Sequence, residues 1–148
     1  MKKIFFLTVF LFTVTLFSQT MKAQTEAQKV ELCSKIAGGA TLLESYPVQL
    51  EAAKDGQRAP IFRQAVMMRK GNKYRFTICT DEESAGEGIL KLFDEAKLMG
   101  TSYIEESGKT YQNFDFDCQK SAVYIIMINF KDGKEGSAVA VVSHVKTL

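Results

Sequence analysis

The sequence predicts an all-β protein: an antiparallel, jelly-roll-like β-sandwich of about eight strands, preceded by one short helix. From Thr41 to the end of the chain, apolar residues recur at every second position in short segments. Polar or glycine-containing loops separate these segments at fairly regular intervals. A helical period occurs in only one place, just before Thr41, and we find neither internal repeats nor an interdomain linker.

Residues 1–23 have the layout of a secretory signal peptide. Lys2 and Lys3 give a positive start, Ile4–Phe17 is mostly apolar, and Ala23 is the best cleavage position. The apolar run is about fourteen residues, shorter than the roughly 20 that span a bilayer as a helix. An uncleaved anchor is the alternative interpretation.

Cleavage would leave residues 24–40 as a short helix and linker, and residues 41–148 as the β-sandwich domain. It would also leave 16 basic and 17 acidic residues, a net charge of −1. Because basic residues are neither in excess nor clustered, nucleic-acid binding is excluded. The mature protein is expected to be exported, periplasmic or secreted, without inserting into the membrane.

The predicted helix runs from about Glu26 to Ala37. Thr25 and Gln28 fit a capping box at its start. Val30, Cys33 and Ile36 recur at helical spacing, and Gly38-Gly39 ends the pattern.

The predicted strands begin after the helix with an irregular or edge strand around Val48 and Leu50, directly after Pro47. In the segment from Lys73 to Thr80, three apolar residues face one way and their polar neighbours the other. Ala122–Phe130 is nearly all apolar and is expected to be a central strand. The remaining strands are expected at Ile61–Arg69, Ile89–Asp94, Lys97–Ile104, Tyr111–Cys118 and Ser137–Val145.

Five stretches follow one another as strands do in a known domain class: KYRFTIC, GILKLFDEAKLMGTS, FDFDC, SAVYIIMINF and GSAVAVV. Over Lys73 to Val145 the chain resembles bacterial pre-peptidase C-terminal (PPC-like) β-sandwich domains. It is more closely similar to a group of uncharacterised secreted bacterial proteins with comparable YRFTIC, FDF-C-QK and DGKEG stretches. The resemblance implies export and an accessory module rather than a catalyst.

Asp115 and Asp117 stand two residues apart, about 7 Å along a strand, and could bind calcium or share acid–base work. They alternate with Phe114 and Phe116, which places them on the solvent face of a half-buried strand. Calcium also needs six or more oxygen ligands. The two aspartates are therefore only weak metal candidates, and no cofactor is expected.

Catalysis has little support in the sequence. His144 is the single histidine, four residues from the end, and is interpreted as an edge-of-sheet residue. No serine or cysteine lies in a nucleophile-elbow sequence. The sequence therefore predicts a protein that is not an enzyme.

Binding is the remaining class of function. Exported sandwiches often recognise proteins or glycans through end loops or an open face. Tyr46, Tyr103 and Tyr111, near strand ends, are weak candidates for ligand contacts, although packing at the sheet rim is the more common role of such residues. The leading hypothesis is a protein-binding or accessory envelope module, and the alternative is a glycan- or small-ligand-binding, lectin-like domain.

Three cysteines in an exported chain favour one disulfide and leave one thiol over. If strands alternate in direction from Lys73, Cys79 and Cys118 end at opposite poles, beyond the ~7 Å between α-carbons that a bridge allows. Cys33 lies on the apolar side of the helix and Cys118 on the apolar side of its strand, whereas Cys79 points outward with Lys73. The prediction is a Cys33–Cys118 disulfide and a free, partly exposed Cys79. The similar secreted proteins have a cysteine at the position of Ser137, which would leave Cys79 without its partner here.

Overall fold

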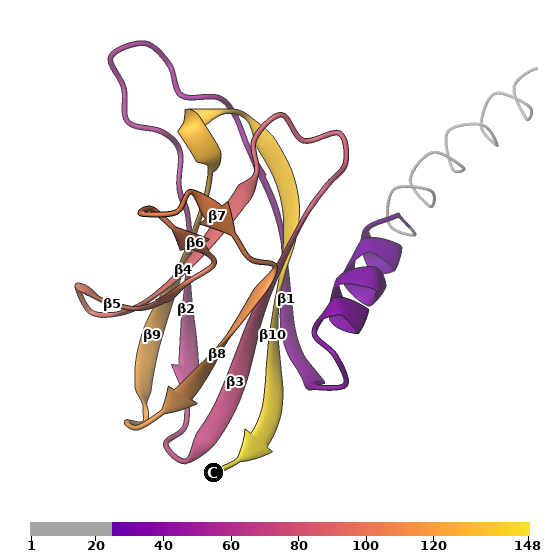
Figure 1. Ribbon diagram of the computed structural model, residues 1–148, viewed down its shortest axis with the longest axis vertical. Coiled ribbons are helices and arrows are strands. Elements are labelled where there is room, and N and C mark those ends of the chain that lie inside the picture. Colours follow the sequence, from indigo (N-terminus) through magenta and orange to yellow (C-terminus); the bar gives the residue numbers. More distant parts are fainter. Residues whose placement is uncertain (1–24) are drawn as a thin grey trace, which may run out of the picture.

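The computed structural model describes residues 25–148 of the chain (Figure 1). The predicted signal peptide, residues 1–23, lies outside the described residues, so its cleavage stays a prediction. The division into a helical segment at 24–40 and a sandwich domain at 41–148 likewise stays a proposal.

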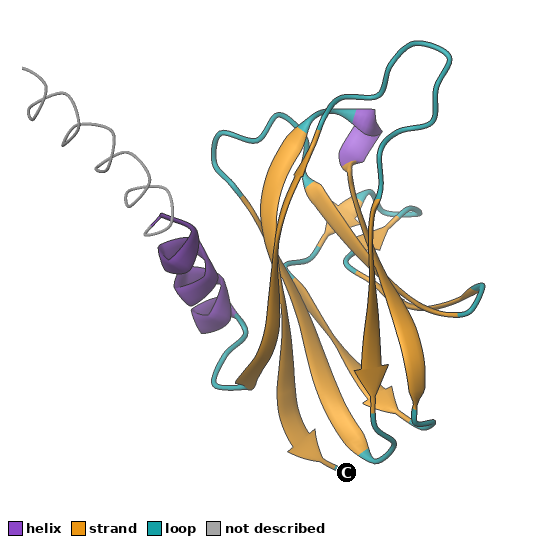
Figure 2. Ribbon diagram, turned by 180° about the vertical axis from the view of Figure 1, so that it is seen from behind, coloured by secondary structure: helices purple, strands orange, loops and turns teal. Residues whose placement is uncertain are grey.

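Two four-stranded antiparallel sheets form the body of the molecule (Figures 1 and 2). Sheet A contains, in spatial order, β1 (Thr41–Leu50), β10 (Gly136–Thr147), β3 (Asn72–Thr80) and β8 (Asn113–Cys118). Sheet B contains β2 (Phe62–Met68), β9 (Ala122–Phe130), β4 (Gly88–Asp94) and β5 (Lys97–Thr101). A separate small pair joins β6 (Tyr103–Ile104) to β7 (Lys109–Thr110), and the 3-10 turn η1 (Lys131–Gly133) links β9 to β10.

The strand order is that of a jelly roll. With the small β6–β7 pair set aside, eight strands remain, and in chain order sheet A is first-eighth-third-sixth. Sheet B is then second-seventh-fourth-fifth. The predicted antiparallel sandwich with a short helix is confirmed, and so is the central position of β9 and the edge position of β1.

The core lies between the two sheets and is built from the inward-facing alternate residues of each strand. Phe76 stacks on Phe114 with ring centroids 5.3 Å apart, and Phe116 meets Tyr124 edge-on at 5.3 Å. The other large buried side chains from both sheets fill the layer: Met68, Leu90, Leu92, Ile126, Ile128 and Val142.

The N-terminal helix covers residues 25–36 of the described chain, close to its predicted extent. It lies on the outer face of sheet A, the side away from sheet B, so the layers run helix, sheet A, sheet B (Figure 1). The predicted cap at Thr25 borders residues 1–24 and stays a prediction. Within residues 25–148 no helix combines the length and apolar character needed to cross a membrane.

One predicted strand, Lys97–Ile104, is in fact two. The chain leaves sheet B at Ser102, whose backbone N–H donates to the carbonyl of Leu90 at 2.9 Å while its hydroxyl accepts from the Leu90 N–H at 2.9 Å. The side chain thus replaces a backbone partner and frees the chain to turn into the β6–β7 pair. The alternation of apolar residues does not indicate where a side chain takes the place of a backbone hydrogen-bond partner.

Candidate functional site

The disulfide joins Cys33 to Cys79, with α-carbons 5.8 Å apart, and Cys118 is the free, buried cysteine. The predicted Cys33–Cys118 bridge and the predicted free Cys79 are therefore wrong. Two steps of the prediction hold: Cys79 and Cys118 lie at opposite ends of sheet A, since Cys118 is paired with Asn72, and Cys79 points outward.

The error lies in where the apolar side of the helix packs. That side covers the outer face of sheet A, where Cys33 contacts Val139 and Val141 and lies beside Cys79. Cys118 belongs to the core on the inner face of the same sheet. The sheet therefore separates the two thiols that were expected to meet.

Three contacts at helical spacing fasten the helix to sheet A. Residues 29, 33 and 37 stand at i, i+4 and i+8, on one side of a helix. Lys29 Nζ lies 2.6 Å from Asp81 Oδ2, and Cys33 bonds to Cys79. At the other end, the Arg75 guanidinium donates to the carbonyl of Ala37 at 2.9 Å. The outer face of sheet A thus has a cover supplied by the chain itself.

Asp115 and Asp117 lie on the outer face of sheet A, where cations of β3 neutralise them. Arg75 donates to both oxygens of Asp115 at 2.6 and 2.9 Å, and Lys73 Nζ lies 3.3 Å from Asp117. The hydrogen bonds from Arg75 lower the pKa of Asp115 despite the opposing effect of partial burial. Within residues 25–148 no group of three or more His, Cys, Asp or Glu side chains is placed to hold a metal ion.

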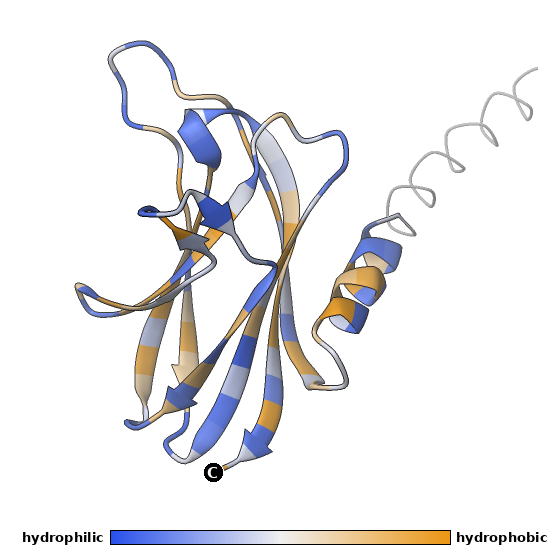
Figure 3. Cartoon of the chain, in the orientation of Figure 1, coloured by the Kyte–Doolittle hydropathy of each residue, from blue (hydrophilic) through white to orange (hydrophobic). Residues whose placement is uncertain are grey.

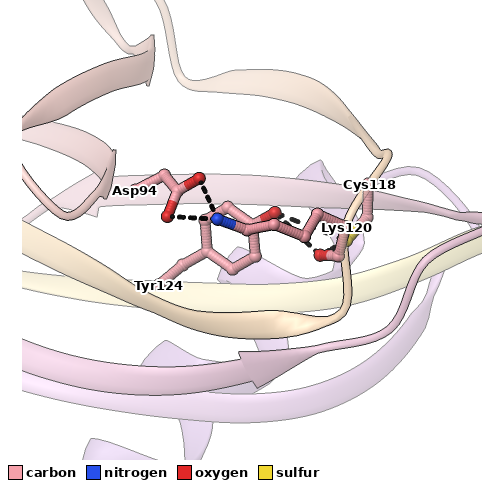
Figure 4. A network of polar contacts seen from close by, with 4 residues as sticks. All are labelled: Asp94, Cys118, Lys120 and Tyr124. Carbon is pink, nitrogen blue, oxygen red and sulfur yellow. Dashed lines mark hydrogen bonds and ion pairs between the residues drawn. The ribbon is translucent and has the colours of Figure 1, made fainter.

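The free thiol of Cys118 takes part in a structural network at the β8–β9 turn (Figure 4). Its Sγ donates to the carbonyl of Lys120 at 3.2 Å, which also accepts from the Tyr124 hydroxyl at 2.9 Å. Burial and the neighbouring Cys118 raise the pKa of Tyr124 to about 12. The Lys120 ammonium binds Asp94 at 2.8 and 3.1 Å. These contacts hold the turn, and a fully buried thiol is a poor nucleophile.

The three candidate tyrosines are not brought together into one site. Tyr46 packs inward against Phe62 across the open side of the sandwich, with ring centroids 6.1 Å apart, and its hydroxyl donates to Glu44. Tyr103, in β6, has the Lys131 ammonium 5.3 Å from its ring centre. Tyr111 is exposed beyond β7.

His144 lies near the end of β10, an inner strand of sheet A rather than an edge strand. Its Nε2 is 3.1 Å from Asn72 Oδ1, and its ring meets Tyr74 edge-on at 6.1 Å. These contacts join the imidazole of β10 to two residues of β3.

A polar cleft of about 660 Å³ opens at the pole where β1, β3 and β10 meet. Asp81 lies in it and is held by Lys29 and by the Ser137 hydroxyl. Burial opposes ionisation of Asp81, but those two hydrogen bonds outweigh it and lower the pKa. Four carboxylates line the cleft: Glu51, Asp81, Glu83 and Glu135. One of them, Asp81, fastens the helix through Lys29.

The outer face of sheet B has an exposed apolar area at one end, while Ile89 of β4, near the other end of the same face, is 5% exposed. Met67 of β2 and Val123 of β9 are paired neighbours and are 66% and 51% exposed. The next row across all four strands is Ala65, Ile125, Phe93 and Leu98. We call these six residues the apolar face; Figure 3 shows hydrophobic bands along β2 and β9 and hydrophilic segments on β3.

Sequence reasoning missed the apolar face, although a signal for it existed. Val123, Ile125 and Met127 alternate with the core residues Tyr124, Ile126 and Ile128, so β9 is apolar on both sides. That pattern predicted a central strand, and β9 is an inner strand of sheet B. Here it marks a central strand whose second face meets solvent.

No protein-family model matches the chain, and the search of curated proteins finds no significant match. The resemblance to PPC-like domains therefore stays a prediction. Among solved structures, the chain is similar to the crystal structure of Aeromonas hydrophila PliG, a periplasmic lysozyme inhibitor of g-type lysozyme. The identity is 11%, the TM-score is 0.49, and the match covers 72% of this chain and 89% of PliG.

Proposed function

We propose that the chain is an exported, non-enzymatic β-sandwich that binds a protein partner through the apolar face of sheet B. One observation carries this proposal: six apolar side chains form two adjoining rows on the outside of sheet B, and all six are exposed or partly exposed. Soluble monomers seldom expose large contiguous apolar patches, and those that they do expose are often interaction sites.

The composition of the apolar face also suits a protein interface. Charged residues are depleted at interface centres, while methionine and aromatic residues are enriched there. Met67, Val123, Ile125 and Phe93 form such a centre, with charged groups only at its margin. A sheet face is moreover flat and rigid, which limits the conformational entropy lost on binding.

Export is part of the proposal. The Cys33–Cys79 disulfide is a kind of bond that persists in oxidising compartments. It agrees with the signal peptide expected from residues 1–23.

A glycan-binding function has less support in the geometry. Stacking on a sugar needs an accessible aromatic ring, and of the three candidate tyrosines only Tyr111 is classed as exposed. Tyr46 is engaged with Phe62, and Tyr103 with Lys131. These side chains offer no shared platform.

Site-specific photo-crosslinking in the native envelope tests the proposal. A photoreactive residue is placed at Met67 and at Leu98 on the apolar face, and at Asp117 on sheet A as a control. We expect a discrete protein adduct from the first two positions and none from Asp117. Absence of adducts from Met67 and Leu98, or equal adducts from all three positions, would contradict it. A glycan array tests the alternative, and purified g-type lysozyme, the enzyme that PliG inhibits, is one defined protein probe.

A further inference from the structure

Two basic side chains border the apolar face in the next row of sheet B, which runs Arg63, Met127, Lys91 and Thr101. In that row Met127 of β9 lies between Arg63 of β2 and Lys91 of β4. The row adjoins that of Ala65 and Ile125, about 7 Å away, because same-face residues are two positions apart along a strand. Binding of a partner to the apolar face would therefore bring that partner over Arg63 and Lys91.

Carboxylates of the described chain neutralise these cations only weakly. Among the described residues Arg63 has no ion pair, and Lys91 reaches only Glu105, at 4.0 Å, whose side chain is 80% exposed. The comparable cations on sheet A are far better paired, since Arg75 holds Asp115 at 2.6 Å. Lys97, at the Asp94 end of the β4–β5 hairpin, is a further exposed cation without an ion pair in residues 25–148.

We propose that the partner of the apolar face is an acidic amphipathic protein segment, whose apolar side chains cover the row from Ala65 to Leu98 and whose carboxylates meet Arg63 and Lys91. The inference rests on the proposed function and names the chemistry of its partner. Charge complementarity carries it: an apolar surface bordered by one cation without an ion pair (Arg63) and one that is only weakly paired (Lys91) selects apolar groups flanked by negative charge.

A second copy of the chain fits this surface less well. Two apolar faces packed against each other would also bring their basic rows into one interface, and like charges placed together there cost several kcal/mol. Carboxylates from elsewhere on a second copy could only reach the face in a head-to-tail arrangement, which forms rings or open chains.

A membrane surface also fits less well. Peripheral anchors bury their apolar groups several ångströms below the headgroups. Here the apolar side chains lie on strands of a sheet and not on a projecting helix or loop, so Met67 and Val123 have no element that carries them beyond the surrounding face. A flat protein surface can meet both kinds of side chain at once.

Titration of the isotope-labelled mature protein with two designed helical peptides tests the inference. Both have the same leucine-rich side, flanked by glutamates in one and by lysines in the other. We expect the glutamate peptide to shift the NMR signals of Met67, Val123, Ile125 and Leu98, and to bind more weakly at higher salt. The lysine peptide should bind at least about tenfold more weakly than the glutamate peptide. Shifts confined to other surfaces, or equal binding of both peptides, would overturn the inference.

Charge reversal provides the matched control. Arg63→Glu combined with Lys91→Glu should weaken binding of the glutamate peptide about tenfold or more and favour the lysine peptide. Lys54→Glu with Arg58→Glu makes the same change in net charge in the exposed loop between β1 and β2 and should leave binding unchanged. Should the Lys91 variant fail to fold, Arg63→Glu alone tests the same point, because Arg63 is exposed. Equal effects of both pairs would count against a specific site.

Two further measurements test whether a second copy of the chain or a membrane surface covers the apolar face instead. Sedimentation at increasing concentration reports self-association, and flotation with vesicles containing phosphatidylglycerol reports membrane binding. Self-association or vesicle binding that Arg63→Glu abolishes, without peptide binding, would overturn the inference in favour of that occupant. A protein adduct from Met67 combined with no preference for the acidic peptide would overturn the inference and leave the proposed function standing.

Discussion

On the outer face of sheet A, the helix covers Val139 and Val141 of β10, and ion pairs follow β3 and β8. On the outer face of sheet B, Val123 of β9 is half exposed, and its neighbours are apolar without a cover from the described chain. β10 and β9 are both inner strands, and both present valines outward. The two faces differ in that the described chain covers these valines of sheet A but leaves the apolar face of sheet B exposed.

The difference teaches how to interpret an apolar strand in a sandwich. Burying a valine side chain stabilises the fold by about 1.5–3 kcal/mol relative to leaving it exposed. Sheet A gains this within the chain, because a disulfide, an ion pair and a capped carbonyl hold the helix in place. On sheet B, the apolar side chains of the apolar face would be buried, and the same stabilisation obtained, only when a partner binds. The exposed Val123, Met67 and Leu98 are therefore interpreted as interface residues.

The largest expected effect comes from removing the fastening of the helix. Replacing both Cys33 and Cys79 by alanine should destabilise the protein by roughly 2–4 kcal/mol, because the bridge closes a loop of 46 residues. Urea unfolding of the variant and the wild type measures the difference. Amide exchange should quicken in the helix and stay unchanged across β2 and β9.

Peptide mapping without reduction provides the control for that experiment. We expect a linked Cys33–Cys79 peptide, and alkylation of Cys118 only after unfolding, because its thiol is fully buried. A Cys33–Cys118 peptide would mean that the helix packs against the inner face, and the contrast between the two faces would disappear.

The second prediction compares two valines. Val139→Thr places a hydroxyl under the helix, where Val139 is 3% exposed, and should cost about 1–3 kcal/mol if the hydroxyl finds no partner. Val123→Thr makes the same change on the apolar face and should alter stability by less than about 0.5 kcal/mol. Chemical denaturation of both variants gives the comparison. Equal costs would show that the apolar face is buried in solution.

The sandwich was predictable because its signal is local. Alternation places Tyr74, Phe76 and Ile78 inward, and loops between apolar segments mark the strand ends. The jelly-roll order follows from few alternatives once eight antiparallel strands are expected. The split of one strand at Ser102 was not predictable, because it depends on a side-chain hydrogen bond to Leu90, a residue of another strand.

The disulfide and the apolar face were not predictable for one shared reason. Each depends on which face of a sheet receives a covering layer. The alternation of β9 indicates that a strand is apolar on both sides, but not whether the chain covers the second side. Cys33 was correctly assigned to the apolar side of the helix, but that side packs outside the sandwich. The two-sided apolar pattern of β9 predicted only a central strand, and Val123 on its outer side is 51% exposed.

The third prediction compares two arginines. Arg75→Ala removes the hydrogen bonds to Asp115 and to the carbonyl of Ala37, and should cost about 1–2 kcal/mol. Arg75→Lys keeps the charge and should recover only part of this, because lysine lacks the bidentate geometry. Arg63→Ala, on sheet B, should change stability by less than about 0.5 kcal/mol, since Arg63 is exposed. Thermal unfolding ranks the stabilities of the three variants. A large loss of stability in Arg63→Ala would mean that Arg63 is paired within the chain, which would contradict the basis for an acidic partner.

The smallest expected effect is a pH dependence confined to sheet A. The pKa of Asp115 is lower in the folded protein than its ordinary value of 3.8, so its stabilising contribution is complete above about pH 4 and is lost as the pH falls through the folded pKa. Asp115→Asn should therefore be less stable than the wild type at pH 7, by about 1 kcal/mol or less, and the difference should shrink below pH 4. Glu105→Gln, in the turn between β6 and β7, is the matched control, because Glu105 approaches Lys91 of sheet B only to 4.0 Å and is mostly exposed. Urea unfolding of both variants between pH 3 and 7 checks this. A pH-dependent loss in Glu105→Gln as large as that in Asp115→Asn would mean that Lys91 is neutralised within the chain, and the basic border of the apolar face would then be too weak to select an acidic partner.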